Sequence, residues 1–83
     1  MSQANASVHA YVLVQTEVGK AVTVANAMLE IPGVVLAQPV AGPYDIIVSA
    51  QADTLDDLLR LVVSRVQLIE GITRTQTCPM MTL

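Results

Sequence analysis

The sequence predicts an α+β domain with the element order βαββαβ, and three observations support this prediction. Two segments with helical spacing of apolar residues alternate with four short runs rich in β-branched residues. Ile-Pro-Gly-Val at 31–34 closes one predicted helix and opens a strand, and Ile-Glu-Gly-Ile at 69–72 repeats this pattern. A turn containing Gly42 and Pro43 joins the two halves. Since βαβ crossovers are right-handed, we expect a ferredoxin-like fold: a four-stranded antiparallel sheet with both helices on one face.

The first half of the chain is expected to contain a strand, a helix and a second strand. Residues 8–15 (VHAYVLVQ) form the first strand, and both of its faces carry large apolar groups. Thr16 is predicted to cap a helix over residues 18–31, which a Pro-Gly pair ends. Residues 34–41 form the second strand, in which Pro39 indicates an irregular or edge position.

The second half repeats this order. A strand is expected over residues 45–52, and either Asp53 or Thr54 caps the helix that follows. Gly71 ends that helix, and residues 72–78 form the last strand. The apolar stripe of the helix follows i, i+3, i+4, i+7 spacing and consists of Leu55, Leu58, Leu59, Val62, Val66 and Ile69.

One sheet face has no helix to cover it in this fold. Candidates for this open face are Tyr11, Leu13, Val35 and Ile47. The chain has 83 residues, of which 53% are hydrophobic and only 13% charged, which is rich in apolar mass for a single small domain. We therefore expect residues 8–83 to form one domain that buries this face against another copy, with residues 1–7 frayed.

Composition excludes several other classes of protein. The formal net charge is −3, and the four basic residues are scattered without aromatic neighbours, so direct nucleic-acid binding is not expected. The single cysteine, Cys78, excludes an internal disulfide framework and fits a reducing cytoplasm. No apolar run reaches about 18 residues, and residues 1–7 lack the pattern of a signal peptide, so neither a membrane span nor secretion is expected.

Catalytic groups are sparse in this sequence. His9 is the only histidine, and no Cys or second His lies at metal-ligand spacing, so no metal or other cofactor is expected. For His9, ordinary packing on a strand is a simpler interpretation than a role as a general base. No basic residue adjoins Cys78 to favour a thiolate, so a buried, inert thiol is the default expectation. The sequence does not predict an enzyme.

Two features point to a small ligand, although each has a structural alternative. In the turn Gly42-Pro43-Tyr44-Asp45, the Asp side chain is expected either to cap backbone N–H groups or to bind a ligand's ammonium group beside the Tyr ring. Thr73, Thr75 and Thr77 alternate along the last strand, which reflects either β-propensity or a row of hydroxyls facing a polar ligand.

These motifs resemble the effector-binding (RAM) domain of the leucine-responsive/asparagine regulator family, Lrp/AsnC. The resemblance covers residue 8 to about residue 80 and rests on three motifs in matching order. They are the Gly-Pro-Tyr-Asp turn at 42–45, the Pro-Gly-Val sequence at 32–34, and Gly-Ile at 71–72 with Thr-Gln-Thr at 75–77. Family regulators also carry a DNA-binding helix-turn-helix domain, which this sequence lacks, so the chain looks like a stand-alone version.

The resemblance implies a fold, an assembly and a ligand. Such domains dimerise through their sheets into an α+β barrel, and the dimers close into rings, often octamers. An effector, typically an amino acid, binds between dimers. The family's effector contacts come from the aromatic–Asp turn and the last strand, which here correspond to Gly42, Tyr44, Asp45, Thr75 and Thr77. Pro43 departs from typical members, stiffens the turn and leaves the identity of the effector open.

Three functions are therefore compatible with the sequence. The leading interpretation is a non-enzymatic amino-acid sensor that forms homo-oligomers and modulates transcription, including by co-assembly with full-length Lrp/AsnC regulators. A purely structural assembly module is the second. A small dimeric ferredoxin-like enzyme is the third, because this fold hosts such activities and fold alone does not determine function.

Overall fold

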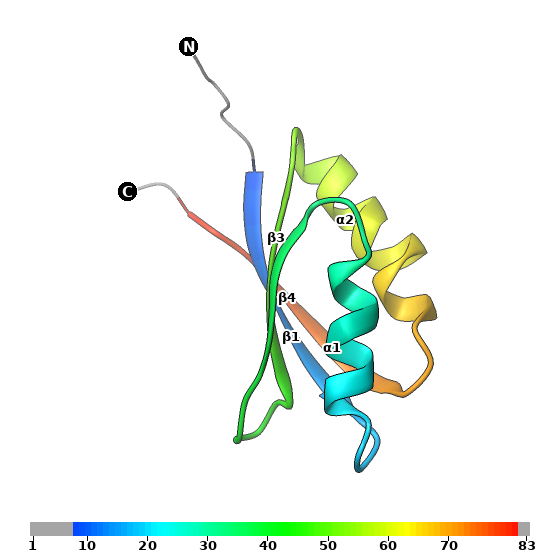
Figure 1. Ribbon diagram of the computed structural model, residues 1–83. Coiled ribbons are helices and arrows are strands. Elements are labelled where there is room, and N and C mark those ends of the chain that lie inside the picture. Colours follow the sequence, from blue (N-terminus) through cyan, green and yellow to red (C-terminus); the bar gives the residue numbers. More distant parts are fainter. Residues whose placement is uncertain (1–7, 82–83) are drawn as a thin grey trace.

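The computed structural model describes residues 8–81 of the chain, and the element order βαββαβ is confirmed (Figure 1). The segment 1–7, predicted to be frayed, lies outside the described residues. A short 3₁₀ helix, η1, follows the second helix. The elements are β1 Val8–Thr16, α1 Ala21–Leu29, β2 Val34–Pro39, β3 Ile46–Ala52, α2 Leu55–Ser64, η1 Val66–Leu68 and β4 Ile72–Pro79.

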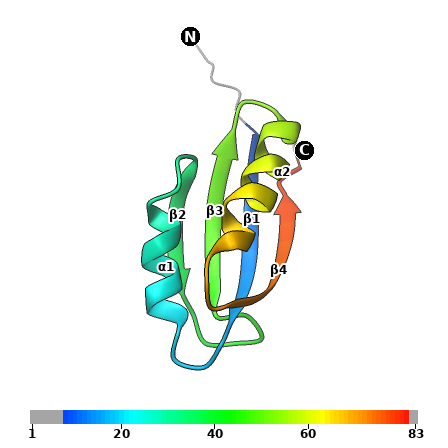
Figure 2. The same ribbon diagram turned by 90° about the vertical axis from the view of Figure 1, so that its right-hand side faces the viewer.

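The four strands form one antiparallel sheet in the order β2-β3-β1-β4, which is the predicted ferredoxin-like topology. Both helices pack on the same face of the sheet, and within the described residues the other face is left uncovered (Figure 1). In the view turned by 90°, α1 lies beside β2, and α2 lies in front of β3 and β1 (Figure 2). β4 is an edge strand outside α2, so its helix-facing side is only partly covered.

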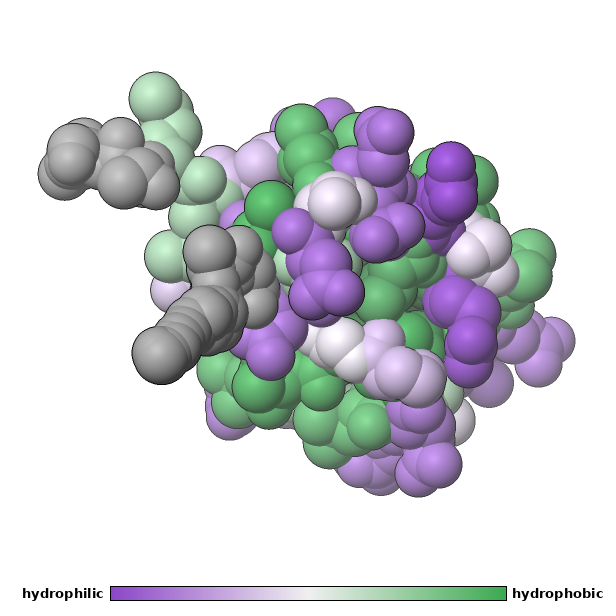
Figure 3. Space-filling view, turned by 90° about the horizontal axis from the view of Figure 1, so that it is seen from above, coloured by the Kyte–Doolittle hydropathy of each residue, from purple (hydrophilic) through white to green (hydrophobic). Residues whose placement is uncertain are grey.

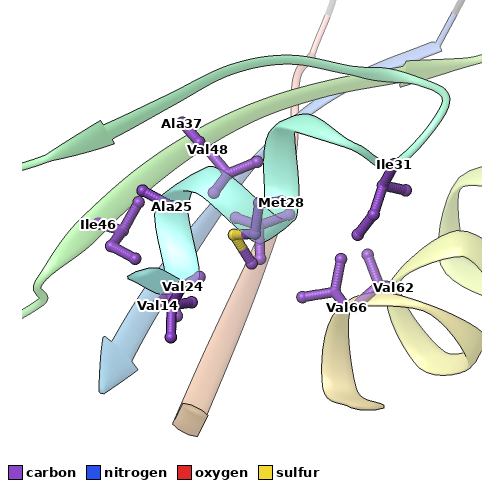
Figure 4. Packing of buried hydrophobic residues seen from close by; sticks show 11 residues of the cluster. Val14, Val24, Ala25, Met28, Ile31, Ala37, Ile46, Val48, Val62 and Val66 are labelled. Carbon is purple, nitrogen blue, oxygen red and sulfur yellow. The ribbon is translucent and has the colours of Figure 1, made fainter. Parts of the chain in front are cut away.

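The core lies between the sheet and the helices (Figure 4). Every second residue of β1 and β3 is buried there, and the register pairs them directly, for example Val12 with Val48. Met28 fills the centre from α1, and Ile31, in the turn after α1, packs near Val62 of α2 and Val66 of η1. The large side chains with less than 2% exposure are Met28, Ile46, Leu58, Val12, Val14, Val24, Val48 and Val66.

The predicted start of the first helix is wrong. Thr16 does not cap a helix but is the last residue of β1, and α1 begins only at Ala21 after a turn in which Gly19 has φ 80°. The reason is tertiary: the Thr16 backbone N–H donates to the Asp45 carboxylate at 2.8 Å, and Thr16 pairs with Ile72 of β4. These contacts hold Thr16 in the sheet.

The second helix begins as predicted, because the Thr54 hydroxyl accepts a hydrogen bond from the Asp57 backbone N–H at 3.1 Å. It ends at Ser64, before the 3₁₀ helix η1, so the prediction that Gly71 ends this helix is wrong. Its predicted apolar stripe is wider than the face that the sheet covers. Leu55 and Leu59 remain 45% and 41% exposed, and hydrophobic patches reach the surface among polar ones when the molecule is seen from above (Figure 3).

The predicted open face is confirmed except at one position. Tyr11, Leu13 and Ile47 alternate with buried residues and therefore point away from the helices. In β2 the register is irregular between Val34 and Leu36, so Leu36, not Val35, occupies the open-face position opposite Ser49. Leu36 is 47% exposed. The open face thus carries an apolar centre drawn from three strands.

Candidate ligand-binding site

The turn at 42–45 is fastened to the end of β1. The Asp45 backbone N–H donates to the Val14 carbonyl at 2.8 Å, and the Asp45 carbonyl accepts from the Val40 N–H at 2.9 Å. The Gln15 side-chain amide donates to the Pro43 carbonyl at 2.8 Å. Three hydrogen bonds from both sides of the turn hold its backbone in one position.

The Asp45 carboxylate has a structural role of its own. Its Oδ2 accepts the Thr16 backbone N–H at 2.8 Å across 29 residues of sequence, in a partly buried position. The Asp45 side chain therefore caps a backbone N–H group, as one of the two interpretations expected, but this group belongs to β1 and not to the turn. A carboxylate has about four lone-pair sites, so this bond leaves acceptor capacity for an ammonium group.

Gly42 has no structural explanation within one subunit. It is exposed and is not among the glycines with positive φ, which are Gly19, Gly33 and Gly71. A Cβ built at Gly42 meets no atom within 4 Å. Tyr44 beside it is half-buried. The described part of the subunit therefore does not require glycine at this position.

The two threonines predicted to face the ligand lie on the helix side of β4. Thr75 pairs with Val14 and Thr77 pairs with Val12, and both valines are buried under the helices. Both threonines are half-buried because β4 is an edge strand. Val14 pairs with Ile46 on its other side, so Thr75 and the turn are two strand spacings apart, roughly 10 Å. One subunit does not bring them into a single pocket.

Thr75 lines a cavity of about 330 Å³ at the start of β4. Its other lining residues are Gln67 from η1 and Ile72, Thr73 and Arg74 from β4. Sequence reasoning missed the contributions of Gln67 and Arg74, since only the fold brings η1 beside β4. The sequence signal for a polar lining at this place was the Thr-Arg-Thr order at 73–75. A second cavity, of about 460 Å³, lies on the outer face of α2 and is lined by Asp56, Leu59, Arg60, Val63 and Ser64.

The remaining reactive side chains include, among residues 8–81, no group of three His, Cys, Asp or Glu residues that could hold a metal ion. His9 is exposed on β1. Cys78 was expected to be buried, and this is wrong: it is exposed because it pairs with Tyr11 on the open face of an edge strand. Neither described helix is long and apolar enough to cross a membrane.

Residues 9–82 match the family model described as "Lrp/AsnC ligand binding domain". A search among curated proteins finds no match.

Several solved structures have the same fold as this chain. FFRP-DM1 is 34% identical with a TM-score of 0.84, over 89% of this chain and 99% of its own. A hypothetical protein, PHS023 of Pyrococcus horikoshii, is 33% identical with a TM-score of 0.84, over 92% of both chains. The transcriptional regulator NMB0573 of Neisseria meningitidis, solved as a complex with L-Met, has a TM-score of 0.79 at 16% identity, over 90% of this chain and 50% of its own.

Proposed function

Because the chain belongs to the family of Lrp/AsnC ligand-binding domains, we propose that it senses an amino acid as a homo-oligomer and catalyses no reaction. Its family makes it a regulatory ligand-sensing domain. We propose in addition that the ligand is an amino acid, that the chain forms a homo-oligomer and that the protein is cytoplasmic. The match over residues 9–82 carries the proposal, and the complex of the Neisseria regulator with L-Met supports an amino acid as the class of ligand.

The proposed recognition site is built on the turn at 42–45 and on β4, with Gly42, Tyr44, Asp45, Thr75 and Thr77 as its residues. The Asp45 carboxylate keeps the acceptor capacity to bind an ammonium group while it holds Thr16. Because Gly42 has no side chain, a ligand could approach the backbone of the turn closely. Since the turn and Thr75 do not share a pocket in one subunit, the complete site requires contributions from two subunits.

Oligomerisation is supported by the open sheet face. Tyr11, Leu13, Leu36 and Ile47 form an apolar centre that no described element of the chain covers (Figure 1). Burying it against a second copy would give a face-to-face dimer, and further association of dimers would form a ring, with eight subunits as one expected size. Co-assembly with full-length regulators of the same family would use the same surfaces and would connect ligand binding to transcription without DNA contact by this chain.

The proposal is tested by screening the twenty amino acids for a rise in melting temperature, followed by calorimetry and light scattering. A ligand at a hundredfold excess over its dissociation constant stabilises the folded state by about 2.7 kcal/mol, or roughly 10–20 °C for a domain of this size. We expect at least one amino acid to produce a shift of this order, and a mass of a dimer or larger. A monomer at micromolar concentration that no amino acid stabilises would refute the proposed function.

A further inference from the structure

We propose that His9, Cys78 and Met80 form a site for Cu(I) at one end of the open sheet face. The site lies apart from the turn at 42–45 and does not depend on the proposed ligand. Spacing along the sequence does not reveal it, because the three residues come from the two ends of the chain. The pairing of β1 with β4 brings them together.

The register of β1 and β4 places the three side chains on the same face of the sheet. Tyr11 of β1 pairs with Cys78 of β4. Two residues further along, the Met80 backbone N–H donates to the His9 carbonyl at 2.9 Å, so these two residues lie opposite each other. His9 and Tyr11 flank the buried Ala10, and therefore point away from the helices. The open face thus ends in an imidazole, a thiol and a thioether.

One metal ion is within reach of all three donors. Cβ atoms of residues that lie opposite each other are about 4.5–5.5 Å apart, and diagonal neighbours are about 7–8 Å apart. Metal ions bind nitrogen and sulfur donors at about 2.0–2.3 Å, and the imidazole and thioether donors stand beyond Cβ. His9 and Cys78 are exposed, and Met80 is 51% exposed. Since β4 is an edge strand, the site lies at the rim of the open face and not in its apolar centre.

The donor set favours a soft ion. Cysteine thiolate and methionine thioether are soft ligands that select Cu(I), and imidazole also binds copper. A structural Zn²⁺ site takes four ligands from Cys, His, Asp and Glu. Among residues 8–81, no third residue of these types joins His9 and Cys78. Three donors that include a thioether therefore fit Cu(I) better than Zn²⁺.

The charges around the site allow a cation to bind. β1 contains no Lys or Arg, and the one basic residue of β4, Arg74, pairs with Gln15 near the other end of β1. The protein has a formal net charge of −3. A cysteine ligand binds metal as the thiolate, so Cu(I) displaces the thiol proton of Cys78 to solvent. The net charge of the site is the same before and after binding.

The test is a competition for Cu(I) between the intact protein and the coloured chelator bicinchoninate, without oxygen and with ascorbate as reductant. The wild type is compared with three variants of the site and one matched control: Cys78→Ser, His9→Gln, Met80→Leu and the control Met81→Leu, whose side chain is 87% exposed. We expect the wild type and Met81→Leu to bind one Cu(I) per subunit. Loss of an outer-shell partner already weakens metal binding by about 10–100-fold, so each site variant should bind at least about tenfold more weakly.

Several outcomes would overturn the inference. They are a wild type that takes no Cu(I) from the chelator, equal affinity in all five proteins, and a loss in Met81→Leu as large as in Met80→Leu. Unchanged affinity in His9→Gln or in Met80→Leu would mean that the three side chains do not act as one site, which also overturns it. Light scattering without metal shows whether each variant keeps its mass. If one does not, X-ray absorption of the Cu(I)-loaded wild type decides: we expect two sulfur donors and one nitrogen donor, and coordination by sulfur alone would contradict the site.

Discussion

Asp45 is expected to serve both the fold and the ligand, and two substitutions separate these roles. Its Oδ2 accepts the Thr16 backbone N–H at 2.8 Å, and its charge is proposed to bind the ammonium group. Asp45→Asn retains an oxygen that can accept the Thr16 N–H but removes the charge. Asp45→Ala removes both. Asp53→Asn, an exposed carboxylate before α2, serves as the matched control.

General values for hydrogen bonds, applied to this contact, set the magnitude of each effect. A hydrogen bond to a charged group contributes about 1.5–3 kcal/mol, and an orphaned, buried N–H costs about 1–3 kcal/mol. Since the Thr16–Asp45 bond is only partly buried, we expect Asp45→Ala to lose about 1–2 kcal/mol, or roughly 4–16 °C in melting temperature. Asp45→Asn should lose less than about 1 kcal/mol. Both should weaken amino-acid binding by about ten- to a hundredfold.

The assay combines melting without ligand, light scattering and calorimetric titration of the three variants. The decisive pattern is an Asp45→Asn protein that keeps its mass and most of its melting temperature but binds at least tenfold more weakly. If Asp45→Asn binds as tightly as the wild type and Asp53→Asn, the charge of Asp45 does not recognise the ligand. If Asp45→Ala has the melting temperature of the wild type, the hydrogen bond to Thr16 does not stabilise the fold, and Asp45 has no structural role.

Four further results are expected. Gly42→Ala should raise the free energy of unfolding without ligand by about 0.4–1 kcal/mol, because its Cβ meets no atom, yet should weaken ligand binding; loss of stability in thermal melts would contradict this. Gly33→Ala should lose more than about 1 kcal/mol in denaturant unfolding, because Gly33 has φ 98° and its Cβ would lie 2.8 Å from both the Gln51 carbonyl oxygen and Leu61 Cδ1. Leu13→Asp should lower the mass in light scattering by placing a charge on the open sheet face, and an unchanged mass would exclude that face as an interface. The wild type should not shift a DNA fragment in gels at physiological salt, because its net charge is −3.

The sequence predicted the topology because its signals are local. Helical spacing, strand alternation and the repeated glycine before β2 and β4 define six elements and their order. Both glycines that follow the helices have the left-handed conformation expected of them, with φ 98° at Gly33 and 101° at Gly71. The Thr54 cap is also local, since it involves groups three residues apart.

The deviations come from contacts between distant residues. Thr16 stays in β1 because Asp45, 29 residues later, binds its N–H. Leu36 reaches the open face because of an irregularity in β2, and a hydrophobicity pattern cannot locate such an irregularity. These deviations are shifts of a few residues that leave the fold unchanged.

The candidate site was only half predictable for the same reason. Alternation placed Thr75 and Thr77 on a common face, but only the pairing with β1 decides that this face points toward the helices. The cavity with Gln67 and Arg74 depends on how η1 packs beside β4, which a linear pattern does not encode. The residues of the turn at 42–45 pointed to a ligand and the family resemblance supported this, but the anchoring of the turn to β1 required the three-dimensional structure.

The most direct measurement of the central claim is a crystal structure of the protein with the amino acid that raises its melting temperature most. The account predicts that the ligand lies between subunits, with its ammonium nitrogen about 2.7–3.2 Å from the Asp45 carboxylate of one subunit. Its carboxylate should lie beside Thr75 and Thr77 on β4 of another subunit. A ligand held entirely within one subunit, or bound away from both the turn at 42–45 and β4, would contradict the account.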